Sequence, residues 1–84
     1  MMIRAKKMPS KLVRRRVVIK VRDMAGMLDI SREELAKRWG VTDKEVRYYI
    51  NGSLVPRVNV FEKILATKAE FVKLIRNKKA LLNR

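Results

Sequence analysis

Apolar residues recur every three or four positions along most of the chain, which is the period of an α-helix. The first such run extends from Val17 to Leu28 and predicts an amphipathic helix that ends near Asp29. The β-branched stretch at residues 17–19 would also permit a short strand, but the helical period continues past it. The same period predicts a core made of Val21, Met24, Ile30, Leu35, Ala36, Val41, Val46, Ile50, Val60, Ile64, Leu65, Val72 and Ile75.

Four later positions carry a helix-start signature, a polar capping residue followed three residues later by glutamate. The pairs are Ser31 with Glu34, Thr42 with Glu45, Asn59 with Glu62, and Thr67 with Glu70. They predict helices over residues 31–39, 42–51, 59–66 and 67–82, of which the last two are either continuous or separated by a bend. With the last two counted separately and the first helix included, the chain predicts an all-α fold, a compact domain of five helices.

Two of these helices are joined by a very short connection. Only Gly40 and Val41 separate Trp39 from the cap at Thr42, so the chain reverses where glycine supplies a positive φ. Ala36 is small enough to let the two helices cross closely, and Trp39 is expected to pack inside the domain. The residues expected to face inward and hold the crossing angle are Val41, Val46 and Tyr49. A short helix, a glycine turn and a capped second helix together predict a helix-turn-helix.

Charge points to a polyanionic partner. The 22 Lys and Arg residues exceed the 8 Asp and Glu residues, which gives a formal net charge of +14. Nine basic residues and no acidic residue fall within residues 1–22, residues 23–66 are balanced, and residues 67–84 are again basic. A balanced centre with basic ends is typical of a reading module with phosphate-binding extensions. The alternative is a solubilising surface rich in lysine.

The charge distribution and the period divide the chain into three parts. Residues 1–16 contain Pro9 and the basic run Arg14, Arg15 and Arg16, and they predict a flexible basic arm. Residues 17–66 form the helix-turn-helix core. Residues 67–84 form a C-terminal helix whose apolar residues exceed the needs of a small core. This excess predicts a homodimer seam made of Phe71, Leu74, Ile75, Leu81 and Leu82; the alternative is that the helix completes the core.

Several classes of function are disfavoured by what the sequence lacks. It has no cysteine and no histidine, so the commonest metal ligands and the commonest general base are missing. We therefore expect no enzyme activity, no metal, no cofactor and no small-molecule ligand. Apolar runs are too short for a membrane span or the core of a signal peptide, and a cytoplasmic, nucleoid-associated location is expected.

The segment ISREELAKRWGVTDKEVRYYINGSLVP resembles the helix-turn-helix of Cro and the phage repressors, the XRE-type family. The resemblance covers about residues 17–66 and places Ala36, Gly40 and Val46 at the three signature positions of the family. It departs at Ile50, where the family often has glutamate, and residues 1–16 and 67–84 have no firm counterpart. The string VRYYINGSLVPR is also similar to a MerR-type pattern, but it has two residues where that pattern has three. The resemblance implies a domain of lambda-repressor-like type that binds double-stranded DNA.

In a helix-turn-helix, the outward residues near the start of the second helix read base edges in the major groove. Here the base-reading candidates are Asp43, Lys44, Arg47 and Tyr48. Arg47 or Lys44 would pair with guanine, and Asp43 would accept from cytosine, with Arg47 the first choice. The resemblance implies backbone contacts by Arg32, Asn51 and Arg57. Further backbone contacts are expected from the hydroxyl of Thr42 and from Arg14, Arg15 and Arg16.

Each base-reading candidate also has a purely structural interpretation. Asp43 suits the positive end of a helix dipole, and Lys44 and Arg47 could be ordinary solvated surface. Tyr48 could cover the domain with its ring. Residues 51–52, Asn-Gly, are first of all a chain reversal, because both tolerate left-handed φ.

The predicted function is a sequence-specific, dimeric DNA-binding regulator of transcription, with repression the expected mode. The alternative is an architectural or non-specific nucleic-acid-binding protein, chromatin-like or RNA-associated, which uses the charge without reading bases. A third interpretation is an interaction module, such as an antitoxin-like partner of another protein.

Overall fold

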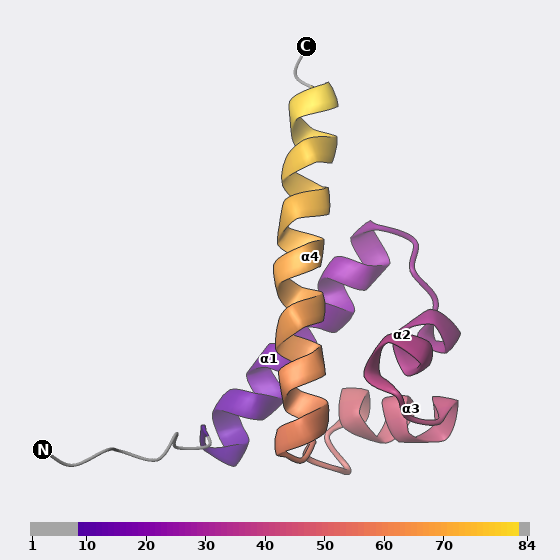
Figure 1. Cartoon of the computed structure of the whole chain (residues 1–84), viewed down its shortest axis with the longest axis vertical. Coiled ribbons are helices and arrows are strands. Elements are labelled where there is room, and N and C mark those ends of the chain that lie inside the picture. The colour runs from indigo at the N-terminus through magenta and orange to yellow at the C-terminus, as the bar shows by residue number, and fades with distance from the viewer. Residues whose placement is uncertain (1–8, 83–84) are drawn as a thin grey trace, which may run out of the picture.

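The structure is a computed structural model of the chain, and it describes residues 9–82. Every regular element within these residues is an α-helix. In chain order the helices are α1 (Lys11–Met27), α2 (Arg32–Trp39), α3 (Asp43–Asn51) and α4 (Val58–Leu82). Figure 1 shows α4 as a long rod that α1 crosses, with α2 and α3 together on one side of it. The all-α class is confirmed, and the count of five helices is wrong.

The first helix begins earlier than its apolar period predicts. Ser10 caps α1 by accepting a hydrogen bond from the Val13 backbone N–H at 3.3 Å. Residues 11–16 are therefore helical, and the predicted flexible arm over residues 1–16 is wrong from Lys11 onward. Residues 1–8 of that arm lie outside the described residues. The arginine run that indicated an arm thus lies in the first two turns of a helix.

The end of α1 is a hydrogen-bonded reversal of the Schellman type. The Ile30 N–H donates to the Ala25 carbonyl at 2.9 Å, and the Asp29 N–H donates to the Gly26 carbonyl at 3.3 Å. Asp29 has a φ of 57°, in the left-handed region that favours glycine. Ile30 is half-buried against the core, so this reversal directs the chain back onto the domain and into α2.

The two short helices match the prediction to within one residue. Ser31 accepts from the Glu34 N–H and caps α2. Gly40 ends α2 with a φ of 70°, and the Val41 N–H after it donates to the Ala36 carbonyl. Left-handed φ costs an L-residue with a side chain roughly 1–2 kcal/mol, which is why glycine suits this turn.

The last helix is a single continuous element of 25 residues. The sequence left open whether residues 59–66 and 67–82 are joined, and they are. Asn59 and Thr67 lie inside α4 and do not cap helices. The Thr67 hydroxyl donates to the Lys63 carbonyl at 2.9 Å and accepts from the Trp39 indole N–H at 3.2 Å. Thr67 is thus a buried polar link between α2 and α4.

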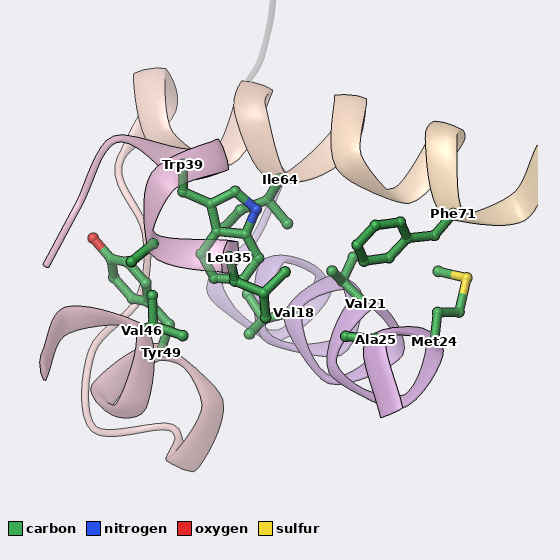
Figure 2. Packing of buried hydrophobic residues seen from close by; sticks show 11 residues of the cluster. Val18, Val21, Met24, Ala25, Leu35, Trp39, Val46, Tyr49, Ile64 and Phe71 are labelled. Carbon is green, nitrogen blue, oxygen red and sulfur yellow. The ribbon is translucent and has the colours of Figure 1, made fainter. Parts of the chain in front are cut away.

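The core lies where all four helices meet, around a fully buried tryptophan. Figure 2 shows the Trp39 ring among side chains from α1, α2 and α4, with Phe71 farther along α4 beside Val21 and Met24. The Trp39 and Tyr49 rings pack at a centroid distance of 6.4 Å, which connects α2 to α3. Trp39 therefore packs inside the domain, as expected.

The predicted core is correct in most positions and wrong in two. Leu65 and Val72 are 41% and 39% exposed, because α4 presents them to solvent. Phe71, assigned to a dimer seam, is buried, so this part of α4 completes the core, as the alternative had it. Buried residues absent from the predicted core list are Val18, Ala25, Trp39, Tyr49, Pro56, Phe61, Thr67 and Phe71.

A charged link joins α2 and α4 next to this core. The Arg38 guanidinium donates to Glu70, lies 3.4 Å from the Glu34 carboxylate and stacks over the Phe71 ring at 5.4 Å.

No helix in residues 9–82 is long and apolar enough to cross a membrane.

Candidate nucleic-acid interface

The outward face of α3 collects polar side chains on one surface of the domain. Lys44, Arg47, Tyr48 and Asn51 are all exposed and are spaced three or four residues apart, so they share one face of the helix. The opposite face carries Val46 and Tyr49, which are 0% and 4% exposed. The predicted base-reading residues are therefore brought together, with Asp43 exposed at the first position of the helix.

The start of α3 is fixed by a complete capping box. The Thr42 hydroxyl oxygen accepts from the Glu45 N–H at 3.1 Å, and the Glu45 carboxylate accepts from the Thr42 N–H at 3.0 Å. The same carboxylate lies 3.1 Å from the Thr42 hydroxyl, which donates to it. This hydroxyl, a candidate phosphate donor, is thus used within the helix, and Thr42 serves mainly to hold α3 in place.

Lys44 and Tyr48 form a pair on the exposed face. The Lys44 ammonium lies 5.8 Å from the centre of the Tyr48 ring, within the range of a cation–π interaction. The Tyr48 side chain is 38% exposed. The pair presents a cation and an aromatic edge side by side, and both suit the surface of a nucleic acid.

The start of α1 lies beside the end of α3. A Cβ atom placed on Gly52 would meet the Arg15 guanidinium at 2.7–2.8 Å, so this guanidinium lies directly against the turn that ends α3. Gly52 has a φ of 84° and closes α3, so the backbone conformation favours glycine here. Arg15 adds a cation to the end of the α3 face, where it also complements the negative end of the helix dipole.

Arg14 lies next to Arg15 but is used differently. Its guanidinium donates to the Pro56 carbonyl at 2.8 Å and to the Pro9 carbonyl at 3.1 Å. Arg14 is half-buried, whereas Arg15 and Arg16 are exposed. These bonds fasten the first turn of α1 to the loop that follows α3, so Arg14 positions Arg15 beside Gly52.

The remaining candidates lie at the margins of the α3 face. Asn51 accepts from the Ser53 N–H at 2.9 Å, which confirms residues 51–52 as a chain reversal. Arg57 is exposed and lines a hollow together with Gly40, Glu45 and Tyr49. Arg32 is exposed at the first position of α2, the end opposite the turn.

The packing of α3 also shifts the pKa of Tyr49. Burial raises the pKa of its hydroxyl above the ordinary value, and the Glu45 carboxylate raises it further. Tyr49 is therefore neutral at physiological pH. Among residues 9–82 no group of three or more His, Cys, Asp or Glu side chains could hold a metal ion.

Sequence reasoning missed the contact between Arg15 and Gly52. The signal that could have found it is Ser10, an N-cap whose third following residue is Val13 rather than glutamate. A cap at Ser10 predicts a helix over residues 11–16, with their arginines on a fixed surface.

Comparison of the chain with family models, with curated proteins and with solved structures finds no match.

Proposed function

We propose that the protein is a sequence-specific DNA-binding regulator of transcription that reads the major groove with α3. The observation that carries this proposal is the α3 face, on which Lys44, Arg47, Tyr48 and Asn51 are exposed while Val46 and Tyr49 anchor the helix. A helix presented in this way, with a short turn before it, fits the docking geometry of a helix-turn-helix.

Arg47 is the residue to which we assign most of the base preference. Its place between Lys44 and Asn51 puts it in the middle of the exposed face, and arginine can bind guanine O6 and N7 together. Lys44 and Tyr48 add a second contact, and Asp43, exposed at the start of α3, is assigned to accept from the N4 amino group of cytosine. We assign repression to the protein as its regulatory mode.

Arg15 and Arg16 are assigned to the sugar-phosphate backbone. Arg15 lies against the end of α3, so a duplex that contacts α3 passes close to the first turns of α1. Contacts of this kind set the position of a protein on DNA and carry no base information. Arg32, Asn51 and Arg57 are further backbone candidates.

The same proposal includes the fold family and a partner. We assign the domain to the lambda-repressor-like type on the α2–turn–α3 geometry and its Ala36, Gly40 and Val46 positions. A homodimer would use Leu74 and Leu81, which are 40% and 68% exposed and lie seven residues apart on one side of α4. Such a dimer would read a palindrome with half-sites about 34 Å apart.

Selection of bound duplexes from a random pool tests the proposal. At ~150 mM salt, where exposed charges are strongly screened, we expect one palindromic site to be enriched. An architectural binder would instead give a pool without sequence preference, retained at low salt only, since counterion release supplies nearly all non-specific affinity. That second result would overturn sequence-specific reading.

A further inference from the structure

An apolar groove lies between the second half of α1 and the second half of α4. Its floor is formed by Met24, Met27, Val72 and Ile75. Met27 is 54% exposed and Val72 is 39% exposed, although both side chains are apolar. The Lys78 ammonium donates to the Met27 carbonyl at 3.2 Å and holds the two helices together at this end. The groove is therefore a supported surface with apolar side chains open to solvent.

The rim of this groove carries only positive charge. Lys20, Arg76 and Lys79 line it, and no acidic residue does. The nearest acidic residue on α1 is Asp23, which pairs with Arg22 at 3.1 Å. A molecule that binds in this groove therefore gains affinity if it carries acidic side chains around an apolar stripe.

The groove is remote from the α3 face along the long axis of the domain. Figure 1 shows α2 and α3 beside the first half of α4, whereas the second half extends past them. The start of α1 contacts the end of α3 through Arg15 and Gly52, while the groove uses residues 20–27 of the same helix. Both surfaces can be occupied at once.

We propose that this groove binds an acidic amphipathic helix of a partner protein. Two helices that enclose an apolar channel accept a third helix through its apolar face, the helix-in-groove mode of recognition. The three cations on the rim then pair with acidic residues that flank the apolar stripe and fix the orientation of the helix. The proposal does not depend on the DNA-binding function.

Two other molecules could be considered for this groove, a second copy of the chain and a nucleic acid. Charge and apolar area together favour the acidic helix over both. A second copy of this chain carries a net charge of +14, and its α4 would bring further lysines against Lys20, Arg76 and Lys79. A nucleic acid would satisfy the cations, but its phosphates would leave the apolar floor uncovered. An acidic amphipathic helix pairs with the cations of the rim and also covers the apolar floor.

A labelled model peptide tests this proposal on the full chain. The probe is a helical peptide of about sixteen residues with leucine on one face and glutamate elsewhere, long enough to be partly helical alone. Its control has the same composition in an order that scatters the leucines around the helix. In fluorescence anisotropy we expect the amphipathic peptide to bind about tenfold more tightly than the scattered one.

Matched variants locate the binding site. Lys20→Glu combined with Lys79→Glu should weaken binding about tenfold, and Met27→Ser should weaken it by a similar factor. Lys73→Glu combined with Lys37→Glu makes the same charge change at two exposed positions outside the groove, and it should leave the affinity within about twofold. Because the altered side chains are exposed, circular dichroism should show all variants folded.

A binding map gives a second, independent readout. The methyl resonances of Met24 and Met27 should shift on addition of the amphipathic peptide, while the indole resonance of Trp39, which donates inside the core, should not.

Four results would overturn the proposal. These are equal affinity for the two peptides, equal weakening by the combined Lys37 and Lys73 variant and by the groove variants, displacement of the peptide by a DNA duplex, and a dimer in sedimentation that Met27→Ser dissociates. If the duplex selection enriched no sequence, the DNA-binding proposal would fail but this groove proposal would still stand.

Discussion

The α2–turn–α3 unit and the α1–α4 pair form their helices in different ways. In the first, side chains next in sequence decide where each helix begins and ends: Ser31, Thr42 and Gly40 make the caps and the turn. In the second, Ser10 and the reversal at Asp29 still bound α1 locally, but α4 runs on through a contact with a distant segment. Thr67 lies inside α4 with its hydroxyl bonded to the Trp39 indole, although its sequence context resembles a cap.

This difference separates two tasks of the molecule. The α2–turn–α3 unit presents an outward face on α3, and its caps and turn set where the two short helices begin and end. The α1–α4 pair supplies the support: Val18, Val21, Ile64 and Phe71, all fully buried, form the surface on which the small unit rests. Changes in the pair should therefore affect global stability most strongly.

The largest effect is expected at the buried aromatic residue in the second half of α4. Phe71→Ala removes a ring that is 0% exposed and should lower the free energy of unfolding by about 3–5 kcal/mol. Leu81→Ala, on the same helix at a position 68% exposed, should change it by no more than about 0.5 kcal/mol. Urea unfolding of both variants measures the difference, and equal small effects would show that α4 does not complete the core.

The next effect concerns the polar link between the two regions. Thr67→Val keeps the shape of the side chain but leaves the buried Trp39 indole N–H without its acceptor, which should cost about 1–3 kcal/mol. Thr67→Ser retains the hydroxyl and should lose less. Thermal unfolding compares the two, and a Val variant as stable as the Ser variant would argue against the link.

Two glycines should respond in opposite directions to alanine. Gly40→Ala forces a side chain into a φ of 70° and should destabilise the domain by about 1–2 kcal/mol. A Cβ on Gly26, within α1, meets nothing within 4 Å, so Gly26→Ala should stabilise by about 0.4–1 kcal/mol. Denaturant titration gives both values, and a Gly40→Ala variant as stable as the unchanged protein would show that the turn does not require glycine.

A smaller increase in stability is expected from a substitution at the end of α1. Asp29 has a φ of 57°, so Asp29→Gly should relieve strain and stabilise the domain by roughly 0.5–1 kcal/mol. Asp23→Gly, inside the same helix, should destabilise the domain by about 0.1–0.3 kcal/mol, because glycine is a poorer helix former than aspartate. Thermal unfolding of the pair checks this, and a loss of stability in the Asp29 variant would contradict it.

The same division explains how much of the structure could be predicted. The α2 and α3 boundaries were predicted to within one residue because their caps lie next to them in the sequence. The start of α1 was missed because Ser10 lacks a glutamate partner and the arginines after it resembled a tail. The period of α4 predicts Leu65 and Val72 to be buried, but both are exposed, because the period fixes a face of the helix and not which neighbour covers it.

The candidate site shows the same contrast. The α3 face could be predicted because Gly40 and Thr42 set the phase of the helix, and the phase determines which residues point outward. The position of Arg15 against Gly52 could not, since it depends on how α1 crosses the rest of the domain. The role of Arg14 as a brace depends on the same crossing.

The most direct test of base reading by α3 compares Arg47→Ala with Arg15→Ala on the selected duplex and on a scrambled one. Arg47→Ala should lose about 1–3 kcal/mol on the selected duplex only, because it removes a base contact. Arg15→Ala should weaken both duplexes equally and reduce the salt slope by about 1, because it removes a phosphate contact. Equal weakening of both duplexes by Arg47→Ala would contradict base reading by α3.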